Sequence, residues 1–149
     1  MNILPTQDEL RMKSQWVHTH LTNMARSADA LPFTFRYGGK RSGDLLAGWL
    51  HQRETTSLDT HRIQHTDRWN DPLTGLEIRC VALEYVDHPA VEWTVYFKNT
   101  GKTLTPILED IQGIDTTFRW YRAIRVDQFR CRGFHPDFRQ RTDGQGGDD

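Results

Sequence analysis

The fold class is decided by the stretch Val91-Glu92-Trp93-Thr94-Val95-Tyr96-Phe97-Lys98. Its purely apolar residues alternate with polar or amphipathic ones, so the pattern repeats every second residue. Successive side chains of a β-strand point to opposite faces, and this period therefore predicts a strand with one buried face. The turn residues Asn99-Thr100-Gly101-Lys102 follow at once and predict that a hairpin closes there.

Neighbouring segments extend the β pattern in both directions. Leu76–Val86 has apolar residues on both faces and is expected to be a central strand. Further strands are expected at Phe33–Tyr37, over Arg53–Trp69 as a strand pair or one long strand, and at Thr105–Ile111, where Pro106 indicates an edge or a bulge. Short strands joined by tight turns, with no helices between them, predict antiparallel sheets and a mainly-β sandwich.

One helix is expected before the strands. Thr6-Gln7-Asp8-Glu9 has the form of a capping box, and apolar residues then recur at helical spacing as far as Ala28. The helix should run from about Gln7 to Ser27 and dock one face on the sheets. The chain divides into the N-terminal helical segment 1–30, the sandwich module 31–118 and the tail 119–149.

Composition limits the classes of partner. The 149 residues suit one domain, and a net charge of −1 gives no overall field that would attract nucleic acid. Seven of the fifteen arginines nevertheless fall between Arg119 and Arg141. This segment is either a nucleic-acid stripe or the product of a shifted reading frame in a GC-rich gene, and we favour the second. Residues 142–149 are expected to be disordered.

The sequence predicts a cytoplasmic protein. Two cysteines, Cys80 and Cys131, are too few for a disulfide framework and are expected to be free thiols. The N-terminus lacks the basic and apolar regions of a signal peptide, and no stretch approaches the ~20 apolar residues of a membrane span. Partners in a membrane are therefore not expected.

No complete catalytic, cofactor or metal site is predicted. His61 and His65 lie four apart, which in a strand separates them by roughly 13 Å, too far for one ion. We expect them on a solvated sheet face. The sequence contains no Gly-x-Ser-x-Gly elbow and no phosphate-cradling glycine loop. Cys80 should lie on the central strand as an inert core residue.

Four residues are candidates for contact with a carbohydrate or another domain. Trp49 and Trp69 could offer flat faces for sugar stacking, although packing within the core or between domains is the favoured interpretation. Asp110 and Asp115 bracket Ile111-Gln112-Gly113-Ile114, expected to be a strand end and loop, where binding residues concentrate.

A family likeness covers about residues 12–118. It is carried by Leu31–Lys40, Thr66–Leu76, Pro89–Gly101 and Pro106–Gln112. These stretches resemble the N-terminal region of bacterial α-galactosidase-like proteins of glycoside hydrolase family 36. The resemblance implies a β-supersandwich like the galactose mutarotase fold, placed ahead of a catalytic (β/α)8 barrel. Since the family's catalytic aspartates sit in that barrel, no position here inherits them.

Three functions remain open. The first is a non-catalytic sandwich module, or a truncated fragment, related to such hydrolases. The second is a stand-alone carbohydrate-binding module for a galactoside, and the third is nucleic-acid binding through the arginine-rich tail. A partial sandwich exposes strand edges and an apolar face. Its stability should therefore require that the N-terminal helix, a second copy or the absent barrel cover that face.

Overall fold

The structure is a computed structural model that describes residues 3–22, 28–122 and 125–133. It confirms a mainly-β, sandwich-like chain with an N-terminal helix, and every strand pairing is antiparallel. In chain order the elements are α1 (Gln7–Val17), η1 (His18–Thr22), η2 (Ala28–Ala30), β1 (Thr34–Tyr37), β2 (Lys40–Arg41), α2 (Ser42–Leu45), η3 (Leu46–Gly48), β3 (Leu50–Ser57), β4 (Arg62–Asn70), β5 (Leu76–Tyr85), β6 (Val91–Asn99), β7 (Leu108–Gln112), β8 (Ile114–Arg122) and β9 (Arg125–Gly133).

One layer is a four-stranded meander in the order β3-β4-β5-β6. The segment Arg53–Trp69 belongs to the strand pair β3 and β4, and β5 is paired on both sides, as predicted for a central strand. Burial alternates along β5, with Leu76, Ile78 and Cys80 directed inward. The period of two in the sequence therefore corresponds to an inner, packed face and an outer, polar face.

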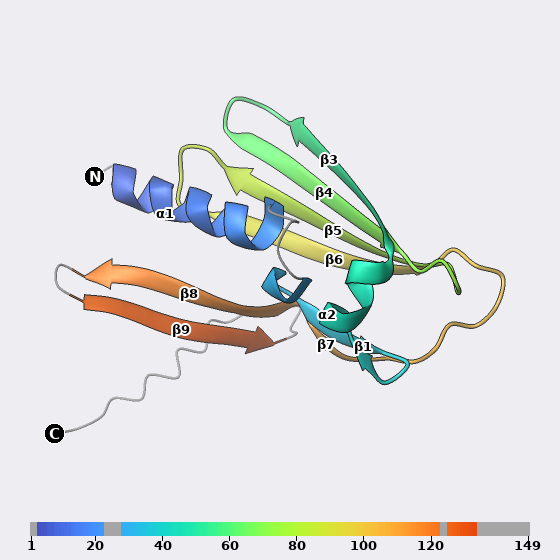
Figure 1. Ribbon diagram of the computed structural model, residues 1–149. Helices are drawn as coiled ribbons and strands as arrows, with labels where there is room; N and C mark the ends of the chain where they lie inside the picture. Colours follow the sequence, from blue (N-terminus) through green and yellow to red (C-terminus); the bar gives the residue numbers. More distant parts are fainter. Residues whose placement is uncertain (1–2, 23–27, 123–124, 134–149) are drawn as a thin grey trace, which may run out of the picture.

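The second layer is built from three pieces that cover the inner face (Figure 1). The three-stranded sheet β2-β1-β7 and the short helix α2 lie toward one end of the meander, and α1 lies toward the other. The hairpin β8–β9 flanks α1 on the side away from the meander. Trp16 of α1 stacks on Trp93 of β6 and on Phe118 of β8, at ring-centre distances of 5.4 and 5.5 Å.

The start of α1 forms as the capping box predicts. The Thr6 hydroxyl accepts from the Glu9 amide, and the Glu9 carboxylate accepts from the Thr6 amide, so two otherwise unpaired backbone donors are satisfied. The helix continues as one π turn, η1, in which Leu21 is buried. Residues 23–27, the end of the predicted helix, lie outside the described residues.

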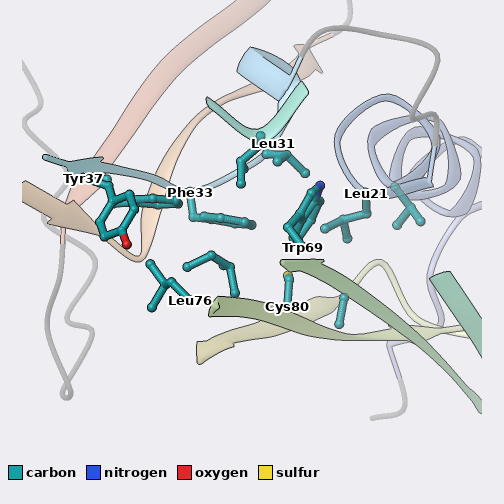
Figure 2. Close-up of a cluster of buried hydrophobic side chains, with 12 residues drawn as sticks. Leu21, Leu31, Phe33, Tyr37, Trp69, Leu76 and Cys80 are labelled. Carbon is teal, nitrogen blue, oxygen red and sulfur yellow. The ribbon is translucent and has the colours of Figure 1, made fainter. Parts of the chain in front are cut away.

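The core sits where β1 crosses the inner face of the meander (Figure 2). Phe33 and Phe35 on the β1 side meet Trp69 and Phe97 edge to face, at ring-centre distances of 6.0 and 5.3 Å. Edge-to-face pairs contribute beyond the apolar area they bury. The predicted alternation of Phe33, Phe35 and Tyr37 is therefore what joins the two layers.

The prediction that a hairpin follows β6 is wrong. β6 is an edge strand of the meander, and the next strand, β7, pairs instead with β1 in the other layer. The Thr100 amide donates to the Gly75 carbonyl, and the Gly38 amide donates to the Ile107 carbonyl, so the intervening chain crosses the end of the molecule. Pro106 precedes β7, which is an edge strand as the proline indicated.

The strand pattern continues past Phe118. β8 runs through that position to Arg122 and pairs with β9, so the boundary predicted at 118 falls inside a strand. The segment predicted to be disordered, 142–149, lies outside the described residues. The same holds for most side chains of the arginine-rich segment Arg119–Arg141. Among the helices that the structure describes, none has the length and apolar character needed to cross a membrane.

Candidate functional site

The two tryptophans proposed for sugar stacking occupy different environments. Trp69 is 1% exposed, with its ring stacked on His51 at 5.0 Å and edge-on to Phe33. A sugar could reach that ring only if the core opened. Trp49 is half-buried at the junction of η3 and β3, where its ring meets Tyr37 edge to face at 5.7 Å. Packing is therefore the role that both geometries favour.

Asp110 and Asp115 are brought together by one arginine. The Arg132 guanidinium of β9 lies 3.3 Å from an Asp110 carboxylate oxygen and 3.5 Å from one of Asp115. Asp115 also accepts a 3.0 Å hydrogen bond from the Thr34 hydroxyl. The cluster links β7, the β8–β9 hairpin and the start of β1, so it ties the pieces of the second layer to one another.

Asp110 has a positive φ of 48°, which only a few residue types tolerate. The cause is a break in register between β1 and β7, where Thr34 pairs with Gln112 but Arg36 pairs with Glu109. An extra residue in one strand produces such a bulge. The bulge turns the Asp110 carboxylate toward Arg132 and the Gln112 amide, which donates to it at 2.9 Å.

Two buried ionic clusters, missed at the level of sequence, join α1 and η1 to the inner face of the meander. In the first, the Lys13 ammonium donates to the Glu84 carboxylate at 3.2 Å and to the Tyr85 carbonyl at 2.7 Å. His65 contacts the second Glu84 oxygen at 3.0 Å and the Thr55 hydroxyl at 3.1 Å. The expectation that His65 lies on a solvated face is wrong, because α1 covers it.

The second cluster is centred on the buried carboxylate of Asp67. The Arg53 guanidinium donates two hydrogen bonds to this carboxylate, from Nε at 2.9 Å and from a terminal nitrogen at 2.8 Å. His51 Nε2 lies 2.7 Å from the same carboxylate. Arg53 also donates to the carbonyls of Leu21 and Thr22, where η1 ends. A cation at the carboxyl end of a helix satisfies unpaired carbonyls and the helix dipole. Arg53 therefore fixes the end of the helical segment to β3.

Glu84 links folding stability to pH. Burial raises the pKa of its carboxyl, but the hydrogen bonds and charges of His65 and Lys13 outweigh burial, so the pKa lies below its ordinary value of 4.5. A carboxyl whose pKa falls on folding stabilises the protein above its unfolded pKa, and this contribution is lost as pH falls through the folded pKa. We therefore expect the free energy of unfolding to decrease below pH 4.5.

Urea unfolding between pH 7 and pH 3 measures this dependence. The Glu84→Gln variant should lose less stability over that range than the wild type. Glu54→Gln, which changes an exposed carboxylate on the outer face of β3, is the matched control and should follow the wild type. Parallel pH profiles for Glu84→Gln and the wild type would contradict the assignment.

Cys80 is a core residue, as predicted. It is buried on β5, and burial followed by the nearby Asp67 charge raises the pKa of the thiol to about 12. A thiol is nucleophilic only when ionised, so this one is inert in the folded protein. The side chain of Cys131 lies outside the described residues.

An exposed apolar surface lies at the end of the meander where the chain crosses between layers. We call this surface, formed by residues 71–75, 100–107 and Leu50, the loop end. Its large apolar side chains are 66% to 95% exposed, and they are Leu50, Leu73, Leu104 and Ile107. In Figure 1 it is the end of the meander farthest from the N-terminus. Large apolar side chains gathered on neighbouring loops are typical of an interaction surface.

Hydrogen bonds hold the loop end in shape. The Thr74 hydroxyl contacts the Tyr37 hydroxyl at 2.7 Å and donates to the Asp71 carboxylate at 2.7 Å. Burial, together with the neighbouring Asp71, raises the pKa of Tyr37 despite the hydrogen bond to Thr74. Gly75, at a φ of 79°, lies so close to Gly101 that a side chain at either position would collide with the other loop. The two loops are therefore packed backbone to backbone.

The described residues contain no group of three histidine, cysteine or acidic side chains placed to hold a metal ion. Comparison of the whole chain with protein-family models, curated proteins and solved structures finds no match in any of the three.

Proposed function

We infer that this chain is a non-catalytic sandwich module whose loop end packs against a second domain. The second domain is a catalytic barrel of the kind that follows the sandwich in α-galactosidase-like hydrolases, which the sequence resembles. The module contributes a docking surface, and the barrel contributes the reaction. Galactoside chemistry is thereby assigned to the partner and not to this chain.

The loop end is the observation that carries the proposal. Leu73 and Leu104 are almost fully exposed, yet the loops that carry them are held by the bonds of Thr74 and Thr100. Rigid loops present apolar side chains without the entropy loss that mobile loops suffer on binding. Burying large apolar side chains contributes about 25 cal/mol per Å² of area removed from water.

The inner face supports the same conclusion. α1 covers this face, and the ionic clusters of Glu84 and Asp67 bind the helix to it. The carboxylates there hold the fold together, with cations and hydrogen-bond donors already in contact with them. The helix thus meets the requirement for a cover on the partial sandwich, while the loop end stays exposed and available to a partner.

A titration with a barrel tests the docking. An α-galactosidase-like barrel prepared without its own sandwich is titrated with this chain, and complex formation is followed by sedimentation velocity. We expect a complex that the double change Leu73→Ser and Leu104→Ser weakens at least tenfold. Leu58→Ser, at the opposite end of β3, is the matched control and should bind like the wild type.

Two results would contradict the docking part of the proposal. One is the absence of a complex, and the other is a complex that the loop-end double change leaves intact. Hydrolysis of an aryl α-galactoside by this chain alone would contradict its non-catalytic part. Circular dichroism of each variant, recorded first, establishes that the changed side chains are not needed for folding.

A further inference from the structure

The outer face of the meander carries two arginines directly opposite each other. Arg68 of β4 and Arg79 of β5 are register partners on the face turned away from the core. The Arg79 guanidinium lies 4.6 Å from the centre of the Tyr96 ring, on the next strand. Like charges at directly opposed positions repel and destabilise a sheet. The pairing therefore needs a compensating interaction.

The described part of the chain provides little compensation. Within it, neither guanidinium donates a hydrogen bond or meets a carboxylate, and the Arg79 Nε atom is buried without a partner. A buried donor without an acceptor is destabilising. Among the described lysines and arginines, those that pair with carboxylates are Arg11, Lys13, Arg53, Arg62 and Arg132. Arg36 and Arg41, also register partners, do not, but neither of them has a buried guanidinium nitrogen without a partner as Arg79 has.

The neighbouring carboxylate on this face lies in the adjacent row and makes no ion pair with either arginine. Glu77, two residues before Arg79 on the same face, is the register partner of Lys98. Gln52 of β3 is the register partner of Arg68 and brings an amide donor to the same row. The row across the sheet therefore consists of an amide, two guanidinium groups and an aromatic ring, from Gln52, Arg68, Arg79 and Tyr96. It contains no anionic group.

We propose that the Arg68–Arg79 pair binds the oxyanion group of a small ligand, either a carboxylate, a sulfate or a phosphate. A guanidinium presents parallel N–H donors that match the oxygens of these groups two at a time. An oxyanion between the two side chains relieves their repulsion. Tyr96 restrains Arg79 by stacking, so its donors are positioned before the ligand arrives. This site is independent of docking at the loop end.

Magnetic resonance of the arginine Nε–Hε groups in the full chain tests the site. The signals of Arg68 and Arg79 are followed during titration with sodium phosphate, sodium sulfate or sodium glucuronate, with chloride used to hold ionic strength constant. Glucose is the neutral match for glucuronate. We expect saturable shifts with at least one oxyanion and none with glucose, and the titrant that saturates identifies the chemical source.

Variants separate this site from general attraction to positive charge. Arg68→Gln and Arg79→Gln should each weaken oxyanion binding at least tenfold. Arg62 lies on the same strand as Arg68, but its charge is already paired with Asp59, so Arg62→Gln should leave the affinity unchanged. Arg68→Gln is the decisive variant, because no described contact of the fold depends on that guanidinium. Unchanged affinity in Arg68→Gln, or no saturable shift with any oxyanion, would overturn the proposal.

Discussion

Replacing Arg53 with methionine is expected to lower the free energy of unfolding by about 3 kcal/mol, at the lower end of the range for breaking a buried ion pair. The Asp67 carboxylate is only 4% exposed, and the change removes its bidentate ion pair with the Arg53 guanidinium. It also removes the donors from the carbonyls of Leu21 and Thr22. Methionine keeps most of the apolar stem, so the loss reports the charge and its hydrogen bonds.

Chemical denaturation followed by tryptophan fluorescence measures this effect. Arg11→Met is the matched control, since Arg11 pairs with Asp8 at 2.9 Å on the exposed side of α1. An exposed pair contributes at most about 1 kcal/mol, so the control should lie close to the wild type. Equal losses in Arg53→Met and Arg11→Met would show that the Asp67 cluster does not hold the helix to the sheet.

Replacing Trp69 with alanine is expected to destabilise the protein by about 3–5 kcal/mol, the cost of removing a large aromatic side chain from a packed core. The ring lies between Leu21 and Phe33 above Cys80, so the cavity would open between the two layers (Figure 2). Thermal or urea unfolding measures the loss. This outcome would also separate a packing role from a sugar-stacking role, which predicts a stable variant.

Tyr96→Ala is the control for this experiment. Tyr96 is an exposed aromatic residue on the outer face, and its described ring contact is with Arg79. An exposed cation–π contact contributes about 0.5–1 kcal/mol, so a small loss is expected. A Trp69→Ala variant as stable as Tyr96→Ala would contradict the position of Trp69 in the core.

Features fixed by local chemistry could be predicted from the sequence. The capping box of Thr6 and Glu9 sets the start of α1, and the alternation from Val91 to Lys98 sets the faces of β6. Apolar residues on both faces of β5 identify the central strand. In each case the deciding interactions join residues close in sequence, or depend on which side of a strand faces water.

Features fixed by contacts between distant segments could not be predicted. Nothing near Asn99 indicates that the chain will leave the meander. The sheet that β7 joins is decided by its pairing with β1, which lies far away in the sequence. The period of two places His65 and Asp67 on the same face as Trp69, but that face is buried only because the helical segment and β1 pack on it. Asp110 and Asp115 were predicted as candidates, whereas Arg132, which joins them, comes from a segment without a clear pattern.

Hydrogen exchange of this chain with and without the barrel tests the docking role of the loop end most directly. We expect binding to slow amide exchange in residues 71–75 and 100–107. Exchange in the turns at the opposite end of the meander, residues 58–61 and 86–90, should stay unchanged. Protection confined to those opposite turns, or no protection anywhere, would contradict it.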